Sequence, residues 1–186
     1  YFFCMIHWTK WALELRSVWK EVLLWCGAGL FLFGVGQALD RTIFPYIVPL
    51  HGSDFDLWTI FFTEVLYYAG LGIFLLLVFW RVFKNPSHHS KLVPALYALI
   101  TAGISVSVLK FVFHIPRPYI NTDLVPLVLD TTYSFPSSHV AVVFALLIPL
   151  WRLSKYIGIV WGLFSLALGS IQVYQLVHYP SDIAMG

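Results

Sequence analysis

The chain has 186 residues, of which 60% are hydrophobic and only 11% are charged, and its mean hydropathy is +0.82. A soluble domain carries about 25% charged residues, so this composition excludes an ordinary soluble globular protein and predicts an all-α, polytopic membrane helix bundle. The formal net charge of +2 is too small to indicate nucleic-acid binding, and the two cysteines, Cys4 and Cys26, lie in apolar segments that predict no disulfide framework.

The first 20 residues predict a helix that lies in the membrane interface rather than crossing it. Apolar side chains recur there at helical spacing, with charged side chains between them. The residues of this apolar face are Trp8, Trp11, Ala12, Leu15 and Val18. A Trp-rich face of this kind is typical of a membrane anchor.

Five apolar segments follow, and a helix needs about 20 residues to cross a bilayer. In chain order the predicted spans are residues 22–39, 57–83, 92–109, 137–153 and 156–177. The glycines expected to permit close contact of the first span with another helix are Gly27, Gly29, Gly34 and Gly36. Pro149 is expected to kink the far end of the fourth span. Pro180 suits the first turn of a sixth helix that is only begun before Gly186, so six transmembrane helices are expected.

The basic residues predict which side of the membrane each loop faces. Eight of the 11 lie in or near the N-terminal segment and the 84–91 and 152–155 turns: Lys10, Arg16, Lys20, Arg81, Lys84, Lys91, Arg152 and Lys155. The other side carries Arg41, Lys110 and Arg117. Because cytoplasmic loops carry the excess of Lys and Arg, the N-terminus is predicted to be cytoplasmic, in a multi-pass protein of the plasma (inner) membrane.

Three short motifs fall on the opposite, extracytoplasmic side. They are Lys110-x6-Arg117-Pro118, Pro136-Ser137-Ser138-His139 and His178-x3-Asp182. Together they supply two cations, a helix N-terminus, two histidines and a carboxylate. Those groups are the parts of a metal-free phosphoryl-transfer site, and no zinc-type Cys/His cluster accompanies them in the sequence.

Each motif also has a purely structural interpretation. The two cations could snorkel to the interface, Ser137 could simply cap the fourth helix, and His139 could be structural, as lone histidines usually are. His178 and Asp182 could be an ordinary pair at a helix start, although a carboxylate four residues from a histidine can also fix its tautomer. Convergence on one side of the membrane favours a single anion-binding site.

Polar residues in and before the second span add a further candidate. Glu64 is an intramembrane carboxylate that either lines the substrate pocket or caps a polar contact between helices. His51, Asp54 and Asp56 lie near the same side and are expected to belong to a loop solvated by water.

On these motifs the chain resembles the type-2 phosphatidic acid phosphatase family, which also includes vanadium haloperoxidases. The family pattern is K-x6-R-P, then P-S-G-H, then S-R-x5-H-x3-D, and the match runs from Lys110 to Asp182. The resemblance implies one transmembrane phosphatase domain over residues 1–186, with six helices, an outward-facing site and no cofactor.

The resemblance also implies a role for each motif residue. His178 would be the nucleophile that forms a phosphohistidine, and Asp182 would orient it. His139 would protonate the leaving alcohol oxygen and then activate water. The groups implied to hold the phosphate oxygens are Lys110, Arg117, Ser137 and the backbone N–H of Ser138.

Two positions depart from the family pattern. Ser138 replaces the Gly, and its N–H stays available if the local conformation is helical. Ile171-Gln172 replaces Ser-Arg, and Gln172 can donate hydrogen bonds but brings no charge. Loss of such a clamp is expected to lower the rate about 10²–10³-fold.

The sequence thus predicts an integral membrane lipid-phosphate phosphatase whose partners are the bilayer and its substrate. The substrates implied are phosphatidylglycerol phosphate, phosphatidate or a polyprenyl (pyro)phosphate. Gln172 motivates a different interpretation, a catalytically impaired relative that binds or moves phospholipids. The same motifs are also compatible with a lipid phosphotransferase or with a phosphatase for a soluble phosphate ester.

Overall fold

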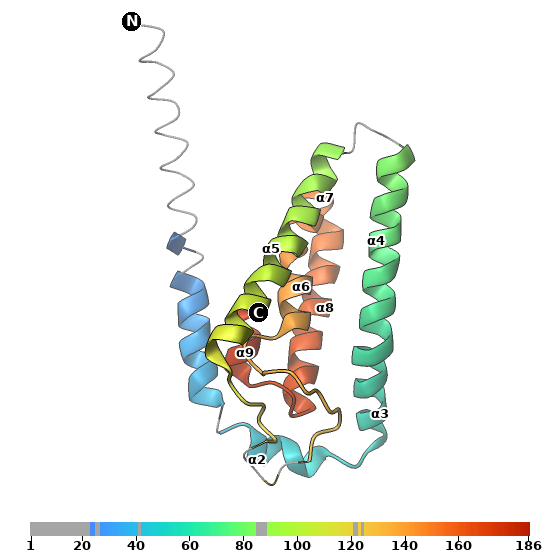
Figure 1. The fold of residues 1–186 in the computed structure, drawn as a ribbon. Helices are drawn as coiled ribbons and strands as arrows, with labels where there is room; N and C mark the ends of the chain where they lie inside the picture. Colours follow the sequence, from blue (N-terminus) through green and yellow to red (C-terminus); the bar gives the residue numbers. More distant parts are fainter. Residues whose placement is uncertain (1–22, 25–26, 41, 85–88, 121–122, 124) are drawn as a thin grey trace, which may run out of the picture.

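The structure is a computed structural model that describes residues 23–24, 27–40, 42–84, 89–120, 123 and 125–186. These residues form a bundle of helices with loops and no strand, which confirms the prediction of an all-α fold (Figure 1). The interfacial helix predicted for residues 1–20 and both cysteines lie outside the described residues.

The longer helices, with two of the shorter ones, form the body of the bundle. Loops and the short helical segment of residues 44–50 close its lower end in Figure 1. The longer helices are Gly27–Leu39, α4 (Tyr67–Lys84), α5 (His89–Phe113) and α8 (Lys155–Tyr174). The shorter ones are α2 (Phe44–Ile47), η1 (Val48–Leu50), α3 (Asp54–Phe61), η2 (Phe62–Leu66), α6 (Ser138–Ala145), α7 (Leu147–Leu153) and α9 (Pro180–Met185).

Three stretches of the described chain are long and apolar enough to cross a membrane, which makes this a multi-pass membrane protein. They are Asp54–Leu76, Val93–Phe113 and Lys155–Tyr174. Two shorter apolar helices, Gly27–Leu39 and Ser138–Arg152, correspond to the first and fourth predicted spans. The total of six transmembrane helices stays a prediction.

The second span begins three residues before the predicted Leu57 and contains a turn of different geometry. Between α3 and α4 the chain makes the π-helical stretch η2, which holds Thr63 and Glu64. Such wide turns inside an α-helix occur frequently at functional sites. The hydropathy of the sequence predicts the span, but a hydropathy pattern does not indicate this π-helical turn.

The fourth span is broken at Leu146, one turn before the kink that we expected at Pro149. Pro149 has no N–H to donate to the carbonyl of Ala145, four residues earlier, so α6 ends there. The indole Nε1 of Trp161 on α8 donates to the carbonyl of Val143 at 2.7 Å, which holds the chain beside the break. Pro149 therefore causes the break in the helix, but the break lies N-terminal to the proline.

The fifth span ends at Tyr174, three residues before the predicted Val177. Leu176 adopts the left-handed conformation, with φ of 62°. The N–H of Leu176 donates to the carbonyl of Val173, and the N–H of Val177 donates to the carbonyl of Gln172, which is the hydrogen-bond pattern of a Schellman motif. Glycine usually fills this position, and a leucine there costs about 1–2 kcal/mol. The fully buried Leu176 side chain packs in a core cluster, which offsets that strain.

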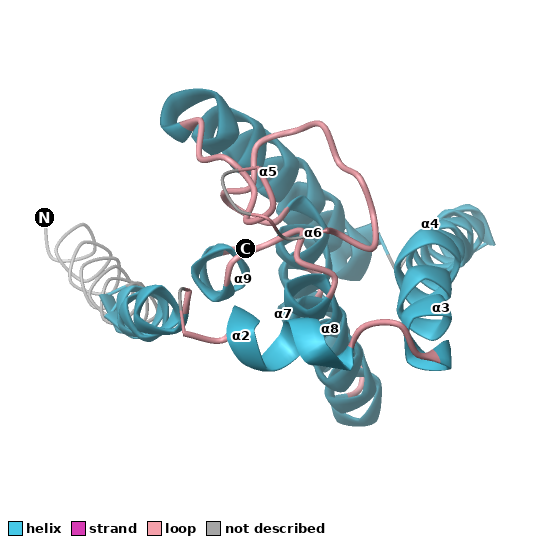
Figure 2. Cartoon of the chain, turned by 90° about the horizontal axis from the view of Figure 1, so that it is seen from below, coloured by secondary structure: helices cyan, strands magenta, loops and turns pink. Residues whose placement is uncertain are grey.

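The helix Gly27–Leu39 lies beside α9 (Figures 1 and 2), and Gly36 makes the closest approach between them. A Cβ on Gly36 would lie 2.7 Å from the Cα of Ser181, so only glycine fits there. Next to it, the carboxylate of Asp40 accepts hydrogen bonds from the N–H and the hydroxyl of Ser181, at 2.9 and 2.7 Å. The expected close contact is confirmed at Gly36; a Cβ on Gly27, Gly29 or Gly34 would meet no described atom within 4 Å.

We expect Gly36→Ala to lower the free energy of unfolding by about 1–3 kcal/mol, because the added methyl group must push the helix away from α9. Thermal unfolding in detergent measures the effect. Gly34→Ala is the matched control, since a Cβ at Gly34 enters open space. Equal melting temperatures for the two variants would show that the Gly36 contact is unimportant for stability.

Candidate active site

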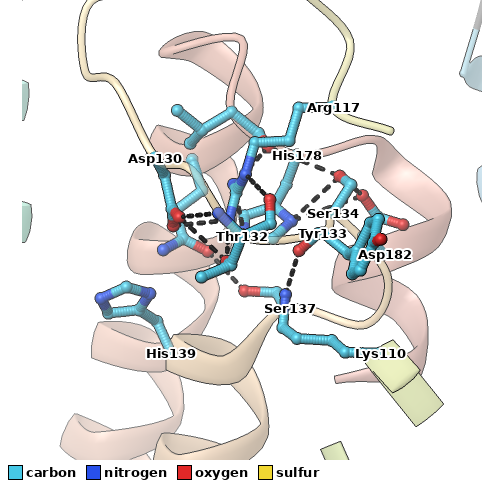
Figure 3. A network of polar contacts seen from close by, with 12 residues as sticks. Lys110, Arg117, Asp130, Thr132, Tyr133, Ser134, Ser137, His139, His178 and Asp182 are labelled. Atoms are coloured by element: carbon cyan, nitrogen blue, oxygen red, sulfur yellow. Dashed lines mark hydrogen bonds and ion pairs between the residues drawn. The ribbon is translucent and has the colours of Figure 1, made fainter. Parts of the chain in front are cut away.

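The three motifs come together in space, and Figure 3 shows Lys110, Arg117, Ser137, His139, His178 and Asp182 near one another. Lys110 lies in the last turn of α5, and Arg117 lies in the loop that follows it. Ser137 and His139 lie at the start of α6, whereas His178 precedes α9 and Asp182 lies in its first turn. Residues as far apart in the chain as Lys110 and Asp182 therefore share one small region.

His178 is held from one side by Asp182. The Nδ1 atom of His178, a residue only 2% exposed, lies 3.4 Å from Oδ2 of Asp182. The same oxygen accepts the N–H of Tyr179 at 2.9 Å and the hydroxyl hydrogen of Ser134. Tyr179 is the N-cap of α9, so the capping box at the start of this short helix also fixes the carboxylate. These contacts assign the ring proton to Nδ1 and leave the lone pair on Nε2.

The surroundings of His178 keep its imidazole neutral. Burial lowers the pKa of His178 below its usual value, the hydrogen bond to Asp182 raises it, and the positive charge of Arg117 lowers it further. The net direction is downward, so the ring is unprotonated at neutral pH and Nε2 can act as a nucleophile.

Arg117 lies beside Nε2 and is almost completely buried, with 1% exposure. An arginine has five N–H donors, and each has an acceptor here. The acceptors are the carbonyls of Thr132 (2.9 Å) and Val177 (2.7 Å), Nε2 of His178 (3.3 Å), Oδ2 of Asp130 (2.5 Å) and Oγ1 of Thr132 (2.9 Å). The guanidinium is therefore fixed in place before any substrate arrives.

Asp130 forms an ion pair with Arg117 that the sequence did not indicate. Burial raises the pKa of Asp130, but a backbone hydrogen bond from Thr132 and the charge of Arg117 lower it, and the net direction is downward. Asp130 is therefore ionised at neutral pH, and its charge compensates that of Arg117.

The start of α6 has the N-cap that was predicted. Oγ of Ser137 accepts the N–H of Val140 at 3.4 Å, so the capping role is confirmed. The Ser137 hydroxyl donates to Oε1 of Gln172 at 2.6 Å, which ties α6 to α8. Ser138 is the first residue of α6, where N–H groups have no acceptor within the helix and favour an anion.

His139 is held by tyrosines of α4 that the sequence did not indicate as partners. Its Nε2 lies 3.2 Å from the hydroxyl of Tyr68, and its ring packs edge-on against Tyr67 with centroids 4.6 Å apart. In the sequence, these contacts could have been suspected only from the position of the Tyr67-Tyr68 pair, which lies one turn after Glu64 in the same span.

A cavity of about 360 Å³ joins the two histidines. Its lining residues include His139, His178, Arg117, Asp130, Tyr68, Gln172 and Glu64. Glu64 lies on the wall of this cavity, and its role in a substrate pocket stays a prediction. Lys110 is not among the lining residues, and its ammonium group donates instead to the carbonyl of Tyr133. Among the described residues, no group of three or more His, Cys, Asp and Glu side chains could hold a metal ion.

Two residues expected in a solvated loop have structural roles instead. Nε2 of His51 contacts the carbonyl of Tyr174 at 2.8 Å. The buried Asp56 accepts the Tyr174 hydroxyl at 2.6 Å and the N–H of Gly52 at 2.5 Å. The prediction was wrong for His51 and Asp56, because both bind the end of α8. Asp54 is exposed, as expected, but it begins helix α3 and does not lie in a loop.

Comparisons with known proteins identify the family and the fold of the chain. The PAP2 superfamily model matches residues 91–186, which contain all three motifs. The fold is similar to that of the first transmembrane PAP2-type phosphatidylglycerolphosphate phosphatase, from Bacillus subtilis, with a TM-score of 0.66 and 22% identity over 90% of this chain and 88% of that one. It is also similar to LpxE of Aquifex aeolicus, with a TM-score of 0.65 and 26% identity over 79% and 88% of the two chains.

One curated relative also matches. The bacitracin transport permease protein BcrC of Bacillus licheniformis is 24% identical over 124 residues, or 66% of this chain. The chain spans 59% of the length of that relative.

Proposed function

This chain belongs to the PAP2 superfamily, and on that premise we propose that it is an integral membrane phosphatase that hydrolyses the phosphomonoester or pyrophosphate of a membrane lipid. The observation that carries the proposal is the neutral, buried His178, whose Nε2 lies beside Arg117 in a cavity shared with His139. Phosphatidylglycerol phosphate, phosphatidate and polyprenyl phosphates are the candidate substrates, and the name of the Bacillus subtilis neighbour favours the first.

In the proposed reaction, Nε2 of His178 attacks the phosphorus atom in line with the leaving oxygen. The N–P bond forms as the P–O bond breaks, and the electron pair passes to the alcohol oxygen, which takes a proton from His139. Water, deprotonated by His139, then attacks the phosphorus atom of the phosphohistidine. The new O–P bond forms as the N–P bond breaks, its electron pair returns to Nε2 of His178, and inorganic phosphate leaves. Asp182 stabilises the positive charge that the His178 ring gains in the first step.

Fixed donors around the phosphorus carry the electrostatic part of catalysis, and no step requires a metal. The groups proposed to hold the phosphate oxygens are Arg117, Lys110, Ser137, the N–H of Ser138 and the amide of Gln172. Lys110 now bonds the carbonyl of Tyr133, so its ammonium group must turn toward the cavity when the substrate binds.

The proposed orientation puts the N-terminus in the cytoplasm and the site on the extracytoplasmic face of the plasma membrane. It rests on the basic residues: Lys84, Arg152 and Lys155 lie at the far end of α4, α7 and α8 from the motifs. The lipid tails would remain in the bilayer while the head group enters the cavity. Residues 1–186 would form one domain, with its active-site motifs between residues 110 and 182.

Phosphate release by the purified protein tests the proposal. The panel contains phosphatidylglycerol phosphate, phosphatidate, a polyprenyl phosphate, its pyrophosphate and soluble glycerol 3-phosphate, all assayed with a chelator present. Release from at least one lipid is expected, with little from the soluble ester. Release only when an acceptor lipid or sugar is added would indicate a phosphotransferase, and strong inhibition by the chelator would contradict the metal-free mechanism.

A second candidate function is binding or transfer of phospholipids without hydrolysis. Two observations favour it: Gln172 replaces a charged residue of the family pattern, and the curated relative is named a transport permease. Movement of a labelled phospholipid across proteoliposomes, unchanged in His178→Ala, would support this function in a protein that releases no phosphate.

We expect Gln172→Arg to raise kcat/KM roughly tenfold or more, because it adds a charged clamp beside the reacting phosphate. Gln172 lines the cavity and is 2% exposed, so a longer side chain can extend into that space. Gln172→Met keeps the size and adds no charge, so it should not raise the rate. If Gln172→Arg and Gln172→Met both lower kcat/KM to the same extent, the site depends on the hydrogen bond from Ser137 to Gln172.

A further inference from the structure

We propose that Asp130 is a built-in competitor for the phosphate site. Its carboxylate occupies, on Arg117, the place that a phosphate oxygen takes, and so it lowers the affinity of the site for anions. This inference rests on the proposed function in one respect, namely that Arg117 binds the phosphate group.

Arg117 has no free donor for a phosphate, because each of its five N–H groups already has an acceptor. Its contacts with the carbonyls of Thr132 and Val177 are to the main chain and hold the guanidinium in the fold. The contacts that a phosphate can take over are those with Oδ2 of Asp130 and Nε2 of His178. A phosphate in their place would lie directly in front of Nε2, where the attack on phosphorus requires it.

Asp130 can leave Arg117 without unfolding the loop. The main chain of Asp130 is anchored by Tyr119, whose hydroxyl donates to its carbonyl at 2.6 Å and accepts its N–H at 3.2 Å. The Asp130 side chain is 33% exposed, whereas that of Arg117 is 1% exposed. The carboxylate can therefore rotate into water while its main chain stays in place.

The charges around the cavity also favour competition between Asp130 and a phosphate. Among the described residues that line it, Arg117 is the one permanent cation, and Glu64 and Asp130 are both carboxylates. Gln172 supplies no second positive charge. A phosphate dianion therefore meets an arginine that is already neutralised, and the product dianion leaves a site in which Asp130 can replace it.

The test measures how tightly inorganic phosphate binds to the parent protein and to Asp130→Asn. Asn keeps the size and can still accept the N–H of Thr132, which now bonds Oδ1 of Asp130 at 2.8 Å, but it removes the negative charge. We expect the inhibition constant for phosphate and the KM for the lipid to fall roughly ten- to hundredfold, because an uncompensated Arg117 binds the anion. We expect kcat to stay level or to fall, because product release becomes slower.

Thr132→Val is the matched control. It removes the Oγ1 contacts to Arg117 and to Oδ1 of Asp130 but keeps the charge, so the inhibition constant should change far less. A constant in Asp130→Asn that is unchanged or higher than in the parent would overturn the inference. So would equal decreases in Asp130→Asn and Thr132→Val, because loosening of the loop would then explain both.

Two further measurements separate this inference from the proposed function. If the parent hydrolyses no lipid, the proposed function fails. Phosphate binding by the two proteins can still be compared by the rise in melting temperature on adding phosphate, which should be larger for Asp130→Asn. If Asp130→Asn does not fold, Asp130→Glu retains the carboxylate and should bind phosphate as weakly as the parent does. Tight binding by the Glu variant would contradict competition by charge.

Discussion

Phosphate release is expected to stop when His178 is replaced by alanine. The Nε2 atom of His178 lies 3.3 Å from Arg117 in the cavity, and removal of the ring leaves the proposed N–P bond without a nitrogen. Loss of a nucleophile lowers kcat by about 10⁴-fold or more in enzymes whose catalytic residues act as a unit. Labelling gives the second readout: the parent should form an acid-labile, base-stable phosphoenzyme from a labelled substrate, and His178→Ala should not.

The control for this prediction is a histidine outside the site. His114 is exposed, follows α5 and adopts a left-handed conformation with φ of 49°, which asparagine tolerates. His114→Asn should therefore release phosphate at the parent rate and form the same phosphoenzyme. Ordinary turnover by His178→Ala would rule out the histidine mechanism.

The sequence predicted the spans and the motif residues because both depend on local patterns. Continuous apolar runs separate lipid-facing helices from loops. The i, i+4 spacing of His178 and Asp182, with Pro180 between them, is likewise local, since it needs one helix start to bring the two side chains together. Ser137 was identified as a helix cap for the same reason.

The partners of these residues could not be predicted, because they come from distant parts of the chain. Ser134 and Asp130 lie in a loop whose course depends on Tyr119 and on the main chain around Val177. Their sequence context, rich in prolines and threonines, fits any exposed loop. Tyr68 contacts His139 only because α4 and α6 lie beside the same cavity, which no local pattern encodes.

The ends of the helices were predicted least well, for a related reason. A glycine would have marked the left-handed residue after α8, but Leu176 has that conformation because its side chain is buried in the core. The break of the fourth span was assigned to Pro149 itself, whereas the missing N–H acts one turn earlier, at Ala145. At Leu176 tertiary packing decided the outcome, whereas at the fourth span the local effect of a proline was assigned to the wrong turn.

Asp182→Asn is expected to lower kcat by roughly 10⁴-fold with little change in KM, as replacing the carboxylate of a catalytic His–Asp pair does elsewhere. Oδ2 of Asp182 accepts from Nδ1 of His178, from the N–H of Tyr179 and from the hydroxyl of Ser134. If the amide NH₂ of asparagine faces Nδ1, the ring proton moves to Nε2 and blocks the attack. If the amide oxygen faces Nδ1, the negative charge that stabilises the phosphohistidine is still missing.

Ser134→Ala separates this catalytic effect from a structural one. It removes one donor to Asp182 but leaves the carboxylate and its charge, so kcat should fall about tenfold or less. Melting temperatures of the two variants, measured beside kcat and KM, complete the comparison. If both variants lose activity in proportion to their loss of stability, Asp182 only holds α9 in place; if Asp182→Asn loses far more activity at a similar melting temperature, its charge acts on His178 during the reaction.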